Sequence, residues 1–229
     1  MKVVLTDYAY DTLQPFSDVY QAAGVEFIPL QCKSKQEVLQ ATEYADGVMT
    51  HYAHIDREVI DNLKNCKIII RSAVGVENID VEAANQRGIS VANVPDYCIE
   101  EVSDYVILLL LASAKKFCVL ERMVQRGEWD YAITKPSDTI HGKTLGLVGC
   151  GNIARAVARK AKVFDMDIIG CDPGVTEQEV AKYGIHLLPQ EKVLQDSDFL
   201  SLHAPLNRYT KHMINRETLS QMKPGAILI

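Results

Sequence analysis

Residues 144–164 read TLGLVGCGNIARAVARKAKVF, and this stretch decides the fold. Its apolar start favours a strand, and the turn Gly149-Cys150-Gly151 leads directly into residues with helical spacing. The first glycine permits a tight turn, the second lets the backbone approach a pyrophosphate, and the small Ala154 stands where a third glycine is usual. Unpaired N–H groups at the start of such a helix bind anions. The stretch therefore predicts a phosphate-binding turn.

The next predicted strand extends this turn into a dinucleotide site. DMDIIGCDP carries Asp172, 21 positions after Gly151. An acidic residue at this strand end accepts hydrogen bonds from the ribose hydroxyls of adenosine. No Lys or Arg follows in residues 172–175 to receive a 2′-phosphate, so the pattern predicts NAD rather than NADP. The alternatives are an ordinary strand–helix turn and an Asp172 that only starts a turn before Pro173.

Strands and helices alternate on both sides of a long central helix, predicted at 99–123. We expect strands at 3–5, 25–30, 47–49, 67–70, 89–91, 144–148, 167–171, 185–188, 198–202 and 226–229. We expect further helices at 12–23, 35–43, 56–63, 81–87, 152–164, 176–183, 191–195 and 216–222. The central helix contains no Gly or Pro, and its all-apolar segment 106–111 predicts burial on most sides. The class is α/β, with two doubly wound parallel-sheet units.

Composition is that of an ordinary globular protein and excludes several ligand classes. The 229 residues are 48% hydrophobic and 24% charged, with a formal net charge of −6. An acidic chain without a Lys/Arg cluster is a poor partner for nucleic acid. The longest apolar run is too short to span a bilayer, so we expect a cytoplasmic protein with no membrane contact. Six cysteines without a CxxC pair indicate buried small side chains rather than a zinc site or disulfide framework.

Histidines at two places in the sequence could take part in binding or catalysis. His203 lies in LSLHAPL (200–206), at a strand end where ligands of α/β sheets bind, and it either faces a cofactor or is a satisfied structural group. His51 and His54 have HxxH spacing, but no Cys or carboxylate completes a metal site. We therefore predict no metal.

Four segments carry a resemblance to a known family. They are RSAVGVENID (71–80), NVPDYCIEEVSDY (93–105), GLVGCGNIA (146–154) with Asp172, and LHAPLNRYTKHMI (202–214). In this order they resemble the D-isomer-specific 2-hydroxyacid dehydrogenases. The segment at 93–105 is most similar to the branch with phosphoglycerate dehydrogenase-like enzymes and C-terminal-binding-protein corepressors. The resemblance implies a flavodoxin-like substrate-binding domain at 1–98 and a Rossmann NAD-binding domain at 99–229 that is incomplete at its C-terminus.

The resemblance also implies roles for individual residues. The substrate carboxylate would bind at Val74 and Gly75, with Tyr52 (beside His51) facing the same cleft. The cofactor would be held by Val102, Gly149, Gly151, Asn152, Ile153, Asp172, His203, Ala204, Pro205 and Thr210. Family members use an Arg to polarise the carbonyl, a His to exchange the proton and a Glu to raise the pKa of that His. These three match positions after Ile229, so residues 1–229 are expected to contain no catalytic residue and to show no turnover.

The segment from 99 to Trp129 matches the dimerisation region of the family, and we expect a homodimer through the cofactor domains. The alternative is that Trp129 packs in a local core. For function, the resemblance implies NAD-dependent interconversion of a D-2-hydroxy acid and its 2-keto acid. Two alternatives stay open: an NAD(H)-sensing, non-catalytic binding protein of the corepressor type, and a fold relative without a cofactor site.

Overall fold

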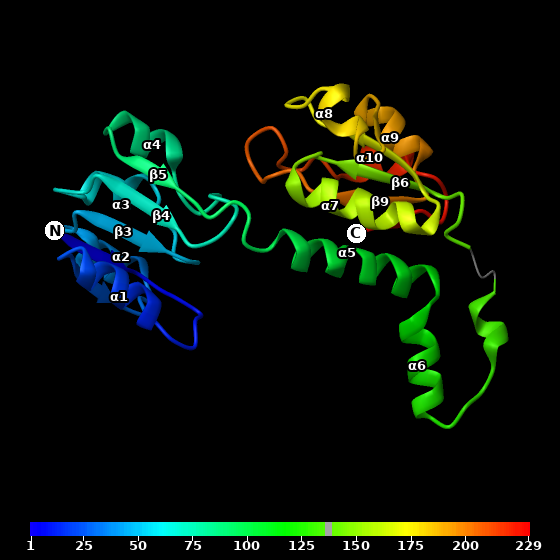
Figure 1. Cartoon of the computed structure of the whole chain (residues 1–229), viewed down its shortest axis with the longest axis horizontal. Helices are drawn as coiled ribbons and strands as arrows, with labels where there is room; N and C mark the ends of the chain where they lie inside the picture. Colours follow the sequence, from blue (N-terminus) through cyan, green and yellow to red (C-terminus); the bar gives the residue numbers. More distant parts are fainter. Residues whose placement is uncertain (136–138) are drawn as a thin grey trace. The chain divides into compact units, whose positions relative to one another are not determined.

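The computed structural model describes residues 1–135 and 139–229 and divides them into two compact units, Met1–Tyr97 and Cys98–Ile229 (Figure 1). Each unit contains one five-stranded sheet, and all strand pairs in both sheets are parallel. Helices cover both faces of such sheets because parallel strands are joined by crossovers. The predicted α/β class with two doubly wound units is confirmed.

The first unit has the strand order β2-β1-β3-β4-β5, which is the flavodoxin-like order. Its elements are β1 (Lys2–Leu5), α1 (Gln14–Ala22), β2 (Glu26–Pro29), α2 (Lys35–Thr42), β3 (Gly47–Thr50), α3 (Arg57–Asn62), β4 (Ile68–Arg71), α4 (Val81–Gln86) and β5 (Ser90–Ala92). Val4, Val48 and Ile69, on the three central strands, are buried in its main core. Side chains that follow β3 and β4 therefore emerge at the same carboxyl edge.

The second unit places its first strand in the centre of the sheet, in the order β10-β9-β6-β7-β8. Counted from β8, this is the order 3-2-1-4-5, which is five of the six strands of a Rossmann sheet. Its elements are α5 (Ile99–Ala114), α6 (Phe117–Gln125), η1 (Tyr131–Thr134), β6 (Thr144–Val148), α7 (Asn152–Ala161), η2 (Lys162–Phe164), β7 (Asp167–Cys171), α8 (Glu177–Ala181), β8 (Ile185–Leu187), α9 (Gln190–Asp196), β9 (Phe199–Leu202), α10 (Arg216–Gln221) and β10 (Ile227–Leu228). Val148 pairs with both Cys171 and Leu202, so three strands end side by side.

Helix α7 packs as its apolar spacing predicts. Val157 and Ala161 are fully buried in the core beneath the sheet, and Ile153 packs against the same cluster. On its other side α7 lies along α5 (Figure 1). Lys160 fastens the two helices, because its ammonium group contacts both the Glu100 and Asp104 carboxylates.

The prediction of one buried helix at 99–123 is wrong in two respects. The chain breaks between α5 and α6 at Lys116, which adopts the left-handed conformation with φ 51° although it is not a glycine. α5 ends about where its packing partner α7 ends, and α6 turns away (Figure 1). Leu108 and Leu109 of α5 are 56% and 40% exposed, since only one side of the helix contacts the rest of the unit.

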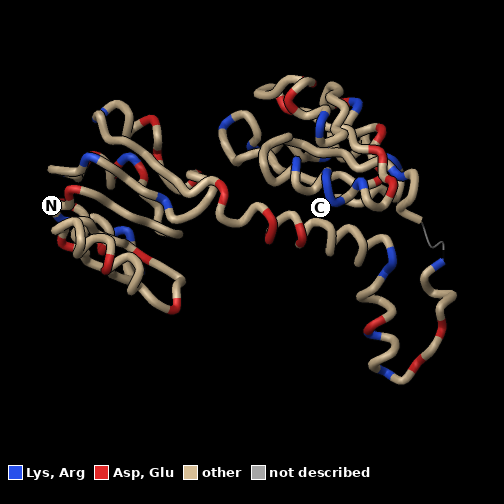
Figure 2. Tube along the Cα trace, in the orientation of Figure 1, with Lys and Arg blue, Asp and Glu red and all other residues tan. Residues whose placement is uncertain are grey.

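The surface features agree only in part with the expectations from composition. All six cysteines are free, but Cys150 alone is buried and Cys118 is exposed, so the prediction of six buried cysteines is wrong. Cationic and acidic residues are interspersed in both units (Figure 2). No helix in the described ranges is both long and apolar enough to cross a bilayer.

Candidate functional site

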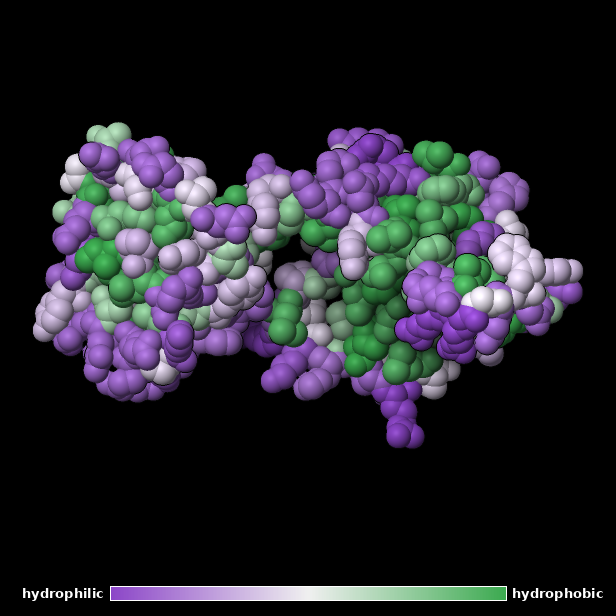
Figure 3. Space-filling view, turned by 90° about the horizontal axis from the view of Figure 1, so that it is seen from below, coloured by the Kyte–Doolittle hydropathy of each residue, from purple (hydrophilic) through white to green (hydrophobic). Residues whose placement is uncertain are grey.

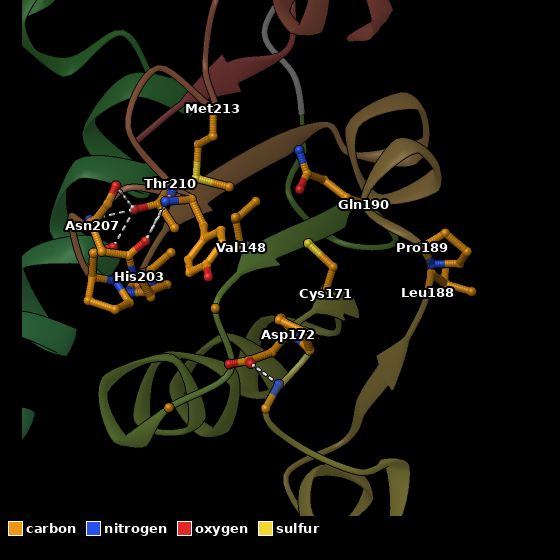
Figure 4. Close-up of a pocket in the computed structure, with 17 residues that line it drawn as sticks. Val148, Cys171, Asp172, Leu188, Pro189, Gln190, His203, Asn207, Thr210 and Met213 are labelled. Atoms are coloured by element: carbon orange, nitrogen blue, oxygen red, sulfur yellow. Dashed lines mark hydrogen bonds between the residues drawn. The ribbon is translucent and has the colours of Figure 1, made fainter.

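A pocket of about 740 Å³ opens at the carboxyl edge of the second sheet (Figure 4). It lies where β6, β7 and β9 end, which is the place where open α/β sheets bind ligands. Its lining residues are Val148, Gly149, Gly151, Cys171, Asp172, Pro173, Gly174, Leu188, Pro189, Gln190, His203, Ala204, Pro205, Asn207, Tyr209, Thr210 and Met213. Seven of the ten predicted cofactor residues are therefore brought together here.

The two glycines of the turn after β6 are required for different reasons. Gly149 has φ +90°, and a Cβ there would lie 2.7 Å from the backbone nitrogen of Ala204. The fold itself therefore demands glycine at this position. Gly151 has an ordinary φ of −74°, and a Cβ there would meet no atom within 4 Å. Packing in the described chain does not require glycine at 151, which fits a backbone kept bare for a close-approaching ligand.

Helix α7 begins immediately after this turn and presents a positive end to the pocket. Gly151 is its N-cap, no side chain caps the helix, and no acidic residue lies in its first turn. The first N–H groups of a helix have no intrahelical partner, and the helix dipole adds partial positive charge there. Asn152 and Ile153 form this first turn, although neither side chain lines the pocket. The arrangement suits an anionic group such as a pyrophosphate.

Asp172 fixes the turn to the end of β7. Its Oδ2 accepts a hydrogen bond from the Cys150 backbone N–H at 2.8 Å. Its Oδ1 accepts one from the Gly174 N–H at 2.8 Å (Figure 4). Among the residues that line the pocket it is the sole Asp, Glu, Lys or Arg. A carboxylate in this setting accepts hydrogen bonds from hydroxyl groups and repels a phosphate.

His203 is held as a neutral structural group. Its Nε2 lies 2.9 Å from the hydroxyl oxygen of buried Ser201, and its backbone N–H donates to the Val148 carbonyl at 2.7 Å. Burial lowers the pKa of the imidazole to about 4. His203 is therefore an uncharged imidazole near neutral pH and is not poised to act as a general acid. The described residues contain two contacts between a histidine and a carboxylate, His141–Asp165 and His186–Glu177, and neither lines the pocket.

The loop after β9 forms the opposite wall of the pocket (Figure 4). The Thr210 hydroxyl donates to the Pro205 carbonyl at 2.5 Å and accepts from the Asn207 N–H at 2.9 Å. Thr210 thus contributes to the wall by closing the loop on itself, with Ala204 and Pro205 also on the pocket side. The sequence analysis did not assign Leu188, Pro189 and Gln190 to the pocket. Their position directly after β8, the strand that pairs with β7, could have indicated it.

The three predicted substrate residues lie in the first unit, directly after β3 and β4. Exposed Tyr52 follows β3, and its N–H, with those of His51 and Ala53, donates to the carboxylate of Asp7. Burial opposes ionisation of Asp7, but these hydrogen bonds together with one from Thr6 lower its pKa overall. Asp7 is a residue that sequence reasoning missed.

Val74 and Gly75 lie in the turn after β4. The Val74 carbonyl accepts a hydrogen bond from the Asn93 side-chain amide at 2.6 Å. A Cβ on Gly75 would overlap the carboxylate of Glu77, which is ion-paired to buried Arg71 at 2.5 Å. The Arg71 guanidinium lowers the pKa of Glu77. This ion pair had no signal in the sequence.

Two further observations concern residues outside these clusters. Val102 lies exposed on the first turns of α5 and does not line the pocket. Within 1–135 and 139–229, no group of three or more His, Cys, Asp or Glu residues could hold a metal ion.

Comparison with known proteins identifies the family. Residues 107–229 match the family profile described as D-isomer specific 2-hydroxyacid dehydrogenase, NAD binding domain. This range contains the whole pocket. The chain belongs to the D-isomer specific 2-hydroxyacid dehydrogenase family. The resemblance seen in the sequence is thereby confirmed, together with the Rossmann fold and the NAD-binding character of the second unit.

Curated relatives of this dehydrogenase-family chain are longer than the chain itself. The chain is 34% identical to D-3-phosphoglycerate dehydrogenase of Methanocaldococcus jannaschii. The match covers 100% of this chain and 43% of that protein. The chain is 38% identical to glyoxylate reductase of Korarchaeum cryptofilum over 86% of its length and 60% of the relative. Among solved structures, D-lactate dehydrogenase of Aquifex aeolicus complexed with NAD and lactic acid is 25% identical, with a TM-score of 0.88 over 99% of this chain and 67% of that one.

Proposed function

We propose that the pocket of the second unit binds NAD(H) in an NAD-dependent oxidoreductase that interconverts a D-2-hydroxy acid and its 2-keto acid. One observation carries the cofactor proposal: Asp172, the sole Asp, Glu, Lys or Arg among the lining residues, is hydrogen-bonded to the glycine turn at the start of α7. The pyrophosphate would bind at the N–H groups of Gly151, Asn152 and Ile153. The ribose hydroxyls of adenosine would donate to Asp172.

The negative charge of Asp172 on the pocket wall also favours NAD over NADP. A 2′-phosphate on the ribose would lie beside the Asp172 carboxylate, and no Lys or Arg lines the pocket to offset that repulsion. The wall formed by His203, Ala204, Pro205 and Thr210 would contact the other side of the cofactor. We assign Val102 to the nicotinamide end on the family resemblance.

The first unit is proposed as the substrate-binding domain, residues 1–98, with the cofactor domain at 99–229. Val74 and Gly75 would hold the substrate carboxylate through backbone N–H groups, and Tyr52 would contact the rest of the acid. These residues follow neighbouring parallel strands, β3 and β4, at the edge where such sheets bind ligands. When bound, the nicotinamide supplies the hydride, and the chain's own residues bind and orient the two reactants.

Proton exchange is the part of the reaction for which the residues that line the pocket offer no group. His203 is neutral with a pKa of about 4, and neither His–carboxylate pair lines the pocket. We therefore propose that residues 1–229 alone bind cofactor without turning over substrate. No observation on the described residues favours a corepressor-type binding protein.

A homodimer through the cofactor domains is the proposed assembly. Trp129 is 86% exposed, so it does not pack in a local core of the described chain. With Phe117, Leu120 and Tyr131 it lines a hollow of about 450 Å³ beside α6. The same unit shows a broad apolar area in the space-filling view (Figure 3). Exposed aromatic and apolar residues of this kind are typical of interface anchors.

The cofactor site is tested most simply by Gly151→Ala. The protein should lose no more than about 1 kcal/mol of stability, because a Cβ at 151 meets no atom within 4 Å and the change costs only the poorer N-cap preference of alanine. NADH affinity should fall at least about tenfold, because the methyl group would occupy the approach of the pyrophosphate. The matched control is Gly142→Ala, which has φ +69° and lies outside the pocket lining. It should lose stability and keep NADH affinity. Calorimetric titration showing unchanged NADH affinity in Gly151→Ala would refute the placement.

A further inference from the structure

The backbone of Cys150, in the middle of the glycine turn, is held by two side chains. Its N–H donates to Asp172 Oδ2 at 2.8 Å, and its carbonyl oxygen accepts a hydrogen bond from Arg155 Nε at 2.9 Å. Arg155 lies on the first turn of α7, but it does not cap the helix, which has no side-chain cap. The bond from Arg155 therefore holds the turn rather than the helix end.

This bond fixes the direction of the next N–H group along the chain. The Cys150 carbonyl and the Gly151 N–H belong to one planar trans peptide unit, so they point in opposite directions. Arg155 and Cys150 do not line the pocket, whereas Gly151 does. A carbonyl that is held away from the pocket turns the Gly151 N–H towards it. Within residues 1–135 and 139–229, this N–H donates to no other group of the chain.

The surroundings of Arg155 keep its side chain at the turn. Its guanidinium lies 5.7 Å from the centre of the Tyr183 ring, within the range of a cation–π contact. Among the described residues Arg155 belongs to no ion pair, so no carboxylate draws it away from the Cys150 carbonyl. A hydrogen bond from a charged donor is stronger than a neutral one and polarises the group that accepts it. The N–H of the same peptide unit then becomes a better donor.

We propose that Arg155 is a positioning residue of the cofactor site, which aims the Gly151 N–H at the bound anion through the Cys150–Gly151 peptide. The inference rests on the proposed function, because the anion is the pyrophosphate of NAD(H). Glycine on each side of Cys150 leaves the turn with few steric restraints. The hydrogen bond from Arg155 removes this freedom in the free protein, so less ordering is left for the moment of binding.

Two substitutions of Arg155 separate its hydrogen bond from its charge. Arg155→Gln places an amide N–H where the arginine has Nε–H, so the donor is kept and the charge is lost. Arg155→Met has a side chain of similar length and loses both. ADP-ribose and adenosine are the probes, because both contain adenosine and only ADP-ribose contains the pyrophosphate.

Calorimetric titration with ADP-ribose should show about fivefold to tenfold weaker binding to Arg155→Met, the range of one hydrogen bond, and binding to Arg155→Gln within about threefold of the wild type. Adenosine affinity, measured by NMR titration, should be equal in all three proteins. A merely structural role of Arg155 would instead weaken the binding of both ligands.

A neighbouring lysine supplies the matched control. Lys182 Nζ also lies over the Tyr183 ring, 5.1 Å from its centre, and forms no hydrogen bond with the turn. Lys182→Met makes the same change of charge and should bind ADP-ribose like the wild type. In the wild-type protein, saturating ADP-ribose should shift the NMR signals of the Gly151 amide and the Arg155 Nε–H together, and adenosine should leave the Arg155 signal in place.

The proposal is overturned if Arg155→Met binds ADP-ribose as tightly as the wild type, or if it loses adenosine affinity equally. It is also overturned if Arg155→Gln or Lys182→Met loses as much ADP-ribose affinity as Arg155→Met. If Arg155→Met fails to fold, the wild-type NMR titration decides, and an unmoved Arg155 Nε–H signal at saturating ADP-ribose overturns the proposal. Wild-type protein that binds neither ligand would contradict the proposed cofactor site itself, so the two failures are distinguishable.

Discussion

His203 should make the stability of the second unit depend on pH in a defined window. Its pKa falls from an ordinary 6.5 to about 4 because the imidazole is buried. Above pH 6.5 the group is neutral in both the folded and the unfolded chain. As pH falls from 6.5 towards 4, the unfolded chain binds a proton that the folded chain does not. The free energy of unfolding therefore falls across this window and stops changing, for this group, below it.

The magnitude follows from the size of the shift. The difference between 6.5 and about 4 corresponds to about 3 kcal/mol, at about 1.4 kcal/mol for each pKa unit. Carboxylates such as Glu77 and Asp198, whose pKa values are lowered, also cost stability in acid. The wild-type profile alone therefore does not isolate the imidazole. His203→Gln is neutral at every pH and keeps a polar group beside Ser201.

Urea denaturation followed by circular dichroism, repeated across this pH range, measures the effect. The wild-type protein should lose about 3 kcal/mol more than His203→Gln between the two pH limits. His141→Gln replaces an exposed imidazole of the same unit and serves as the control. Its profile should follow that of the wild type. Parallel profiles for wild type and His203→Gln would refute the account of His203 as a partly buried neutral group.

Three further outcomes are expected. Gly149→Ala should destabilise the second unit by roughly 2–4 kcal/mol in urea denaturation, because the methyl group meets the Ala204 backbone and φ is +90°, while Gly142→Ala should cost only roughly 1–2 kcal/mol for its positive φ. Trp129→Ala should weaken self-association at least about thirtyfold in analytical ultracentrifugation, as loss of an interface anchor does, whereas exposed Val163→Ala on the same unit should not. Residues 1–229 should bind NADH, but no 2-keto acid should be reduced by it at the rates of the family, because the lack of a positioned acid lowers the rate of proton transfer roughly 10²–10⁴-fold. Measurable turnover that His203→Gln abolishes would contradict this expectation.

Local features of the fold were predictable from sequence. The turn at Gly149 and Gly151, the helix after it and the position of Asp172 depend on residues close together in the chain, and their spacing carries the signal. The strands also fall close to their predicted limits, because β-branched runs bounded by polar residues identify them. The break at Lys116 was missed, because a lysine in the left-handed conformation gives no sequence signal comparable to Gly or Pro.

The polar network of the first unit depends on contacts between distant residues. Asp7 bonds the backbone of His51, 44 positions later, and Arg71 bonds the His51 carbonyl across 20 positions. A single sequence shows which residues are charged, but not which backbone groups they reach. The same limit applies to the pocket wall, where Leu188, Pro189 and Gln190 join Asp172 only because β7 and β8 are neighbours.

The relative affinity for NADH and NADPH tests the central claim most directly. Calorimetric titration of the wild-type protein should give tighter binding of NADH, because in the proposed site Asp172 would accept the ribose hydroxyls and repel a 2′-phosphate. Asp172→Asn should weaken NADH binding and narrow the difference between the two cofactors. Asp196→Asn, at the exposed end of α9, makes the same change outside the pocket lining and should alter neither affinity. Equal or tighter binding of NADPH by the wild-type protein would contradict the account.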